Sequence, residues 1–286
     1  MNDATKSYFD LHTTGHGWIS RIRKVEPKKG QPFWACTVEA LYGSTQFPSR
    51  RFIDMRVSGS EAQRLLREHA EKDTSDKLFV EFRAGDLWTD VYTRTKGDQA
   101  GTTAVSIKAR LLQVKVVNPL LLGFDHYALV TRGVGYLNRI HRFDDALAVS
   151  IAALNGSPDD LEYRYFDVRV VSEEMQRLMR RCENAVSEEK KVLVSFRLDD
   201  LQAKLFTRTK GDRAGETDAS LKSALVHVGM IKVDGDKVYE APRREETETA
   251  DDPQPEQPAE AAQAEQQAPR QAVDTGSVGA GEAATA

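Results

Sequence analysis

Aromatic and cationic side chains alternate along one short stretch of the sequence, residues 88–96. Trp88 and Tyr92 lie four positions apart, and Arg94 and Lys96 follow at intervals of two. In an extended strand such positions share one face. Rings on which bases stack, set beside cations that neutralise phosphates, are typical of proteins that bind single-stranded nucleic acid. The stretch therefore predicts a nucleic-acid-binding face, with the alternative of an ordinary solvated face whose rings cover a neighbouring element.

The end of this stretch occurs twice in the chain. The letters TRTKGD occupy residues 93–98 and again residues 207–212. Other similarities recur at a nearly constant spacing, among them a Gly-x-Gly-aromatic motif at 15–18 and 133–136. Regular self-similarity indicates a tandem duplication, with copies at about residues 8–117 and 126–234. Because Gly and Asp are typical turn residues, the exact repeat predicts a hairpin turn.

Each copy is expected to contain the same elements in the same order. The predicted strands of the first copy are residues 18–25, 33–42, 52–57, 78–82 continuing at 87–96, and 105–117; those of the second are 136–143, 146–154, 165–171, 192–210 and 219–233. A helix should follow the third strand, because Ser60 with Gln63 has capping-box spacing and Ser172 precedes two glutamates. Three strands, a helix and two strands are the order of an OB-fold.

Side-chain periodicity predicts which residues fill the barrels. Alternation in the third strands places Ile53, Met55 and Val57 inward, and likewise Phe166, Val168 and Val170. Helical spacing predicts an inward stripe made by Met175, Leu178, Met179, Cys182 and Val186, matched in the first copy by Ala62, Leu65, Leu66 and His69. The predicted fold class is mostly β with one helix per repeat (β-β-β-α-β-β): two tandem OB-fold barrels plus a disordered C-terminal tail.

Charge and composition divide the chain further. Residues 241–286 hold 3 Lys and Arg against 10 Asp and Glu, which leaves a net charge of +3 for residues 1–240 out of the total of −4. The last segment also lacks the large apolar residues that could form a core. The predicted domains are an N-terminal OB-fold repeat at 1–117, a short apolar connection at 118–125, a C-terminal OB-fold repeat at 126–240 and a disordered acidic tail at 241–286.

The candidate nucleic-acid-binding residues are exposed rings and cations on the predicted outward faces of strands. In the first copy they are Phe33, Phe52, Arg56, Trp88, Tyr92, Arg94, Lys96 and Lys108; in the second they are Tyr165, Arg169, Phe206, Arg208 and Lys210. The second copy has Gln202 in place of Trp88 and Ala146 in place of Phe33. The first repeat is therefore expected to bind more tightly, and the second to serve mainly in dimerisation.

No motif predicts catalysis or the binding of a cofactor or metal. Cys36 and Cys182 stand far apart, so they are expected to be buried thiols, and Asp86, Asp199 and Asp200 are interpreted as turn residues. No apolar run approaches the roughly 20 residues that span a bilayer. The chain is thus expected to be a cytoplasmic, non-enzymatic protein with no membrane partner, and an OB-fold module that binds other proteins remains the alternative function.

Each repeat resembles the single-stranded DNA-binding (SSB) OB-fold family, most closely at residues 87–105, where an aromatic and basic strand enters a Gly- and Asp-containing hairpin. The whole chain also resembles, over about residues 8–234, a family of replication-associated proteins carried by bacterial integrative conjugative elements, with the doubled TRTKGD as hallmark. These resemblances imply single-stranded DNA or RNA as the ligand, a homodimer that supplies four OB units, contacts with replication proteins through the acidic tail, and a role in replication or transfer of a mobile element.

Overall fold

The structure is a computed structural model that describes residues 11–72, 77–142, 146–157, 159–209 and 211–242. The first repeat contains β1 (His12–Val25), β2 (Phe33–Ser44), β3 (Ser49–Val57), α1 (Ser60–Glu71), β4 (Leu78–Thr93) and β5 (Thr103–Val116). A short 3-10 helix η1 (Pro119–Leu121) and β6 (His126–Tyr127) lead to β7 (Val130–Arg142), β8 (Leu147–Ser157), β9 (Asp160–Val170), α2 (Glu173–Arg181), α3 (Glu183–Ser187), β10 (Val192–Thr207), β11 (Thr217–Val233) and β12 (Asp236–Glu240). Among the described residues, no helix has the length and apolar character needed to cross a membrane.

Each repeat closes into a five-stranded barrel. In the first, β1 pairs with β2 and β4, β2 with β3, β3 in parallel with β5, and β5 with β4, so the circuit returns to β1. The strands β7 to β11 repeat these pairings, including the single parallel pair β9–β11. With the helix between the third and fourth strands, this is the predicted OB-fold topology in both copies.

The predicted core positions of the third strands are confirmed, and so are those of the helices except His69, which is half-buried and lies outside the core cluster. Ile53, Met55 and Val57 are at most 2% exposed, and the corresponding residues of β9 are equally buried. In the helical stripe, Met175, Leu178, Met179 and Cys182 are buried and Val186 packs against the same cluster. Burial raises the pKa of the Cys36 thiol to about 12 and that of the Cys182 thiol to about 11, as expected for core cysteines.

Three local predictions need correction. The N-cap of α1 is Gly59 rather than Ser60, and the capping box is absent because the Gln63 side-chain amide donates instead to the carbonyls of Val57 and Ser58. In the second copy Ser172 does cap α2, accepting a hydrogen bond from the Met175 N–H at 3.2 Å. The helix there is broken into α2 and α3, and the first strand of each repeat begins earlier than predicted, at His12 and Val130.

The repeated Gly-x-Gly motif is explained by close packing between and within the barrels. A Cβ on Gly17 would lie 2.4 Å from the Glu39 carbonyl oxygen, so the backbones of β1 and β2 require glycine there. Gly15 instead makes room for Leu129 of the second repeat, and Gly133 makes room for Leu11 of the first. The motif therefore serves barrel closure at one glycine and barrel-to-barrel contact at the other.

The two barrels are joined through their first strands. Residues 12–14 of β1 pair antiparallel with residues 130–132 of β7, and the buried hydroxyls of Thr13 and Thr131 lie 2.8 Å apart. Two ion pairs then cross the junction in opposite directions. Arg51 of the first repeat binds Asp200 of the second, with Nε 2.7 Å from Oδ1, and Arg164 of the second binds Asp86 of the first at 2.7 Å.

The interpretation of these aspartates as turn residues was wrong. Asp86 and Asp200 lie inside β4 and β10, each at an irregularity of the strand pairing. Both adopt a left-handed backbone, with φ of 52° and 61°, which aspartate tolerates better than most residues. The local kink lets each carboxylate bind an arginine of the other repeat, so these residues fix how the barrels sit together.

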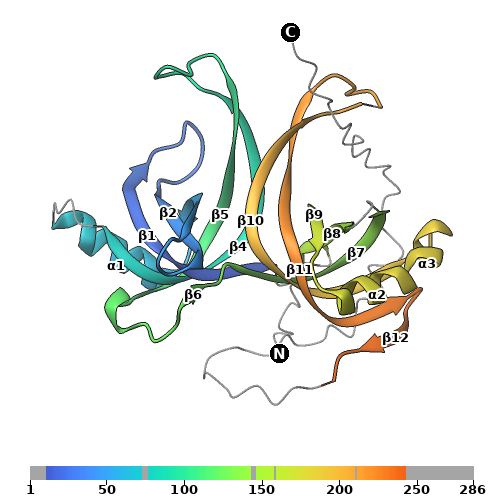
Figure 1. The fold of residues 1–286 in the computed structure, drawn as a ribbon. Helices are drawn as coiled ribbons and strands as arrows, with labels where there is room; N and C mark the ends of the chain where they lie inside the picture. Colours follow the sequence, from blue (N-terminus) through green and yellow to red (C-terminus); the bar gives the residue numbers. More distant parts are fainter. Residues whose placement is uncertain (1–10, 73–76, 143–145, 158, 210, 243–286) are drawn as a thin grey trace, which may run out of the picture.

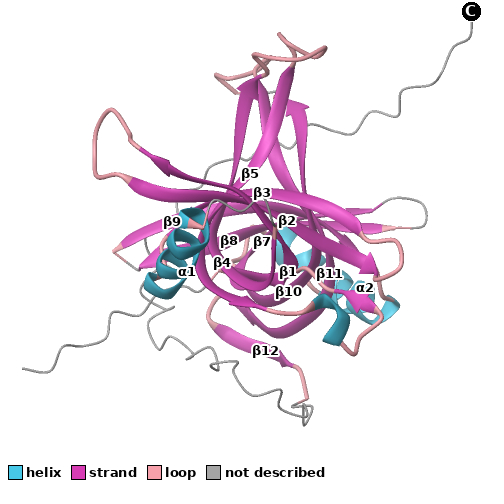
Figure 2. Ribbon diagram, turned by 90° about the vertical axis from the view of Figure 1, so that its left-hand side faces the viewer, coloured by secondary structure: helices cyan, strands magenta, loops and turns pink. Residues whose placement is uncertain are grey.

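Beyond the barrels, β4–β5 and β10–β11 extend as two hairpin arms, from Trp88 to Lys108 and from Gln202 to Lys222. The arms are in contact, because the Thr89 hydroxyl donates to the Ala219 carbonyl at 3.4 Å. Figure 1 shows both arms rising on the same side of the molecule, and Figure 2 shows β12 on the opposite side. Any ligand held by one arm is thus close to the other.

Candidate nucleic-acid interface

Four strands of the first barrel place their outward side chains in one row. The register sets Thr37 of β2 beside Asp54 of β3, Asp54 beside Lys108 of β5, and Lys108 beside Trp88 of β4. Neighbouring strands lie about 4.8 Å apart, so this row runs roughly 14 Å across the barrel. We call this surface, together with the next outward residues of β3, β4 and β5, the outer face of the first barrel.

Large rings stand exposed on this face. Phe52 is 60% exposed, Tyr92 43% and Trp88 37%. Phe52 precedes Asp54 by two positions and Tyr92 follows Trp88 by four, so all three rings point outward in the observed strand phase. Three exposed rings on one face provide free ring surfaces on which bases can stack.

Cations lie between and beside the rings. The Arg56 guanidinium stacks over Phe33 with its carbon 4.6 Å from the ring centroid. Lys108 lies 3.0 Å from the Asp54 carboxylate and 3.6 Å from that of Asp90. Partial burial acts to raise the pKa of Asp54, but hydrogen bonds from Thr37 and Lys108 lower it. This carboxylate therefore stays charged and holds Lys108 in place.

The arm tip carries the two remaining predicted cations of the first repeat. β4 ends at Thr93, so the prediction that the strand continues to Lys96 was wrong, and Arg94 and Lys96 are exposed residues of the hairpin loop. The backbone N–H of Arg94 donates to the Thr102 carbonyl at 2.9 Å, and Gly97 and Gly101 adopt left-handed φ of 79° and 86°. The predicted hairpin turn at Gly97 is confirmed, and its tip presents positive charge to solvent.

The second barrel presents a weaker version of this face. Tyr165 is 39% exposed and Arg169 is exposed, whereas Phe206 is half-buried. Arg208 is held by Asp218, with Nε 2.8 Å from Oδ2, and Gln202, which replaces Trp88, donates to Asp200 at 2.7 Å. Lys210 lies outside the described residues. Fewer free rings and cations are therefore available here than in the first barrel.

Some residues next to this face were missed at the level of sequence. Arg21 and Arg23 of β1 and Arg110 of β5 are exposed; Arg110 lies opposite Arg56 in the register and 3.4 Å from Asp86. The signal was present in the letters, because Arg21, Arg23 and Lys24 form a basic run at the end of the first strand. Among the described residues, no group of three potential metal ligands is found.

Comparisons with known proteins place the chain as follows. A family model described as protein of unknown function (DUF3577) matches residues 2–118 and 124–247. No curated protein matches the chain. Among solved structures, the wild-type single-stranded DNA binding protein from Thermus aquaticus has a TM-score of 0.44 and 8% identity, covering 83% of this chain and 97% of that chain. A deletion mutant of the same protein has a TM-score of 0.44 and 10% identity, covering 83% and 99%.

Proposed function

The chain belongs to the family of proteins of unknown function (DUF3577), and we propose that it is a non-enzymatic protein that binds single-stranded nucleic acid, with single-stranded DNA as its ligand. One observation carries this proposal: the outer face of the first barrel exposes Phe52, Trp88 and Tyr92 beside Arg56 and Lys108. Duplex DNA hides its bases within the stack, so exposed rings with free faces favour an unpaired strand.

The contacts available on this face are largely independent of base sequence. Stacking on a ring contributes roughly 1–3 kcal/mol per base for any base, and cations bind phosphates that every nucleotide carries. We therefore expect broad sequence tolerance and affinity that falls as salt rises. In the cell, such binding fits replication or transfer of a mobile element, where two chains would supply four barrels and the acidic tail would contact replication proteins.

A fluorescence titration with oligo(dT) at several salt concentrations tests the proposal. Trp88 is the ring expected to stack, so binding should quench its emission, while Trp18 and Trp34, which pack partly buried against apolar clusters, should change little. Trp88→Phe should keep most of the affinity and lose the quench. Trp88→Ala with Tyr92→Ala should weaken binding by about 1–3 kcal/mol per ring, or roughly 5- to 150-fold in Kd for each.

Phe47 supplies a control ring, because it is 86% exposed in the loop between β2 and β3, outside the strands that form this face. Phe47→Ala should leave the affinity unchanged. No binding by the wild type at low salt would refute nucleic-acid binding. Unchanged affinity in a folded Trp88→Ala, Tyr92→Ala variant would instead show that this face is not the contact surface and would favour a protein-interaction module.

A further inference from the structure

A bulge near the end of β1 turns two arginines toward the outer face of the first barrel. The pairing of β1 with β2 shifts between Ser20 and Arg23, and Arg21 in the bulge adopts a left-handed backbone with φ of 53°. Arginine has no side-chain oxygen that could favour this conformation locally, so the surrounding strands impose it. The effect of the bulge is that Arg21 and Arg23 are both exposed, while Ile22 packs against the core.

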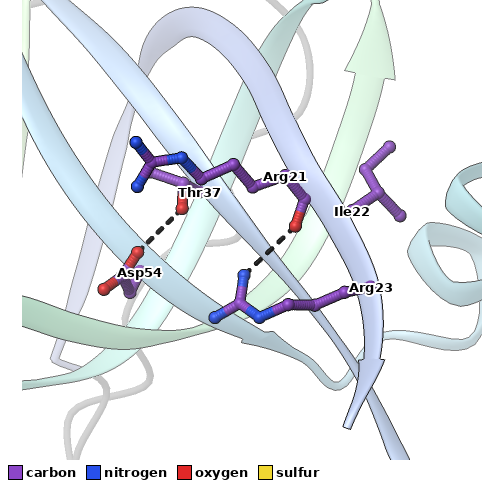
Figure 3. Close-up of a pocket in the computed structure, with 5 residues that line it drawn as sticks. All are labelled: Arg21, Ile22, Arg23, Thr37 and Asp54. Atoms are coloured by element: carbon purple, nitrogen blue, oxygen red, sulfur yellow. Dashed lines mark hydrogen bonds between the residues drawn. The ribbon is translucent and has the colours of Figure 1, made fainter. Parts of the chain in front are cut away.

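These residues line an open pocket of about 380 Å³. Its walls are Arg21, Ile22 and Arg23 from β1, Thr37 from β2 and Asp54 from β3. Figure 3 shows both guanidinium groups reaching from β1 across the pocket toward the side where Thr37 and Asp54 lie. The Arg23 side chain is held in this position by a hydrogen bond from Nη1 to the Arg21 carbonyl at 3.1 Å.

The pocket carries excess positive charge. Asp54, the one carboxylate among the lining residues, accepts hydrogen bonds from Thr37 at 2.8 Å and from Lys108 at 3.0 Å, and the charge of Arg23 also lowers its pKa, so it faces two arginines and a lysine. Within the part of the chain that the structure describes, neither Arg21 nor Arg23 forms an ion pair with a carboxylate. Two guanidinium groups with free donors in one pocket match the oxygens of a phosphate group, which they can bind through paired hydrogen bonds.

We propose that the Arg21–Arg23 pocket binds a backbone phosphate of the strand that stacks on the outer face of the first barrel. The inference rests on the proposed function and adds to it a fixed anchor point. The pocket shares Thr37 and Asp54 with the row that leads through Lys108 to Trp88, so one strand can occupy both. The second repeat does not repeat this anchor. His141, paired with Ala148, takes the place of Arg23, which is paired with Ala35, and Arg139, the counterpart of Arg21, lacks its left-handed backbone.

A charge-matched pair of variants tests the anchor. Arg21→Gly with Arg23→Gln removes both guanidinium groups, and glycine adopts the left-handed backbone without strain, so the bulge is kept. Arg177→Gln with Arg181→Gln removes the same charge from exposed positions of α2 in the second repeat. Oligo(dT) affinity is measured for each across a salt series, together with the Trp88 quench at saturation.

The pocket variant should bind more weakly than the α2 variant, and the slope of log affinity against log salt should become shallower by about 0.7 for each phosphate that is no longer bound. Its quench at saturation should be unchanged, because stacking is untouched. Equal affinities and slopes for the two variants would overturn the anchor while leaving the proposed function intact, whereas no binding by the wild type would overturn both. Inorganic phosphate should compete only weakly; saturation of the pocket by free phosphate without any loss of oligo(dT) binding would also overturn the anchor.

Discussion

The reciprocal ion pairs between the barrels should contribute measurably to stability. Arg51 and Asp200 have side chains only 21% and 14% exposed, and two N–O distances of 2.7 and 2.9 Å make the contact bidentate. Removing one partner of a fully buried pair costs about 3–5 kcal/mol, because the other charge is left without a partner. For this pair, which is mostly but not wholly buried, we expect Asp200→Asn to cost about 2–3 kcal/mol.

Asparagine is the informative replacement because it also tolerates the left-handed backbone and can still accept the Leu201 N–H bond of 2.7 Å. For a domain of this size the expected loss corresponds to a fall of roughly 4–12 °C in Tm. The assay is urea unfolding of four proteins: wild type, Asp200→Asn, Arg51→Met and the double variant. Because the two residues contact each other, the double-mutant cycle should give a coupling energy of about 1–2 kcal/mol.

A control pair separates this effect from a general loss of surface charge. Arg213 and Glu216 form an ion pair whose side chains are more than half exposed, so its removal should leave the urea midpoint unchanged. If the losses from Asp200→Asn and Arg51→Met simply add, the pair does not couple the barrels. That result would refute the role of the Arg51–Asp200 pair in the junction.

Two further predictions concern acid stability and backbone packing. Partial burial acts to raise the pKa of Asp200, but the hydrogen bond from Arg51 lowers it in the folded chain. The associated stability is present above the unfolded pKa of about 3.9 and should be lost as the pH falls below that value. The urea midpoint should therefore drop steeply below about pH 4, and it should drop less in Asp200→Asn. Gly17→Ala should destabilise far more than Gly97→Ala, because the new Cβ at position 17 would lie 2.4 Å from the Glu39 carbonyl oxygen. The Cβ at position 97 meets open space, so that substitution costs only about 1 kcal/mol for its left-handed backbone. Comparable losses of stability in urea unfolding would contradict this packing.

Local periodicity was sufficient to predict the barrels but not their junction. The alternation of Ile53 and Met55 with polar residues depends only on which side of one strand is buried, and that side is visible in the letters. The arginine that binds Asp86 across the junction is Arg164, 78 positions away in the other repeat, and no local pattern connects them. The duplication relates the two ion pairs only indirectly: Arg51 and Arg164 occupy equivalent positions of the two repeats, and so do Asp86 and Asp200.

The candidate site was predictable where strand phase is regular and unpredictable where it breaks. Trp88 and Tyr92 keep the alternation of β4 and were expected to be exposed. Continued alternation from Ile19 would place Arg21 and Arg23 on the buried side of β1, and the bulge reverses this phase. The prediction for Arg94 and Lys96 was wrong for another reason. The strand ends at Thr93, so these residues lie in a loop whose geometry depends on Gly97 and Gly101.

Differences between the repeats now have a spatial meaning. Positions that hold the molecule together are occupied by the same residue types in both copies, namely Leu11 and Leu129, Thr13 and Thr131, Arg51 and Arg164, and Asp86 and Asp200. Four positions on or beside the outer face differ in the second copy: Trp88 becomes Gln202, Arg23 becomes His141, Arg110 becomes Ala224 and Phe33 becomes Ala146. Each replacement removes a ring or a permanent cation from the second barrel. Gln202 also donates to Asp200, the carboxylate that binds Arg51, so the position that offers a stacking ring in the first barrel supports the junction in the second.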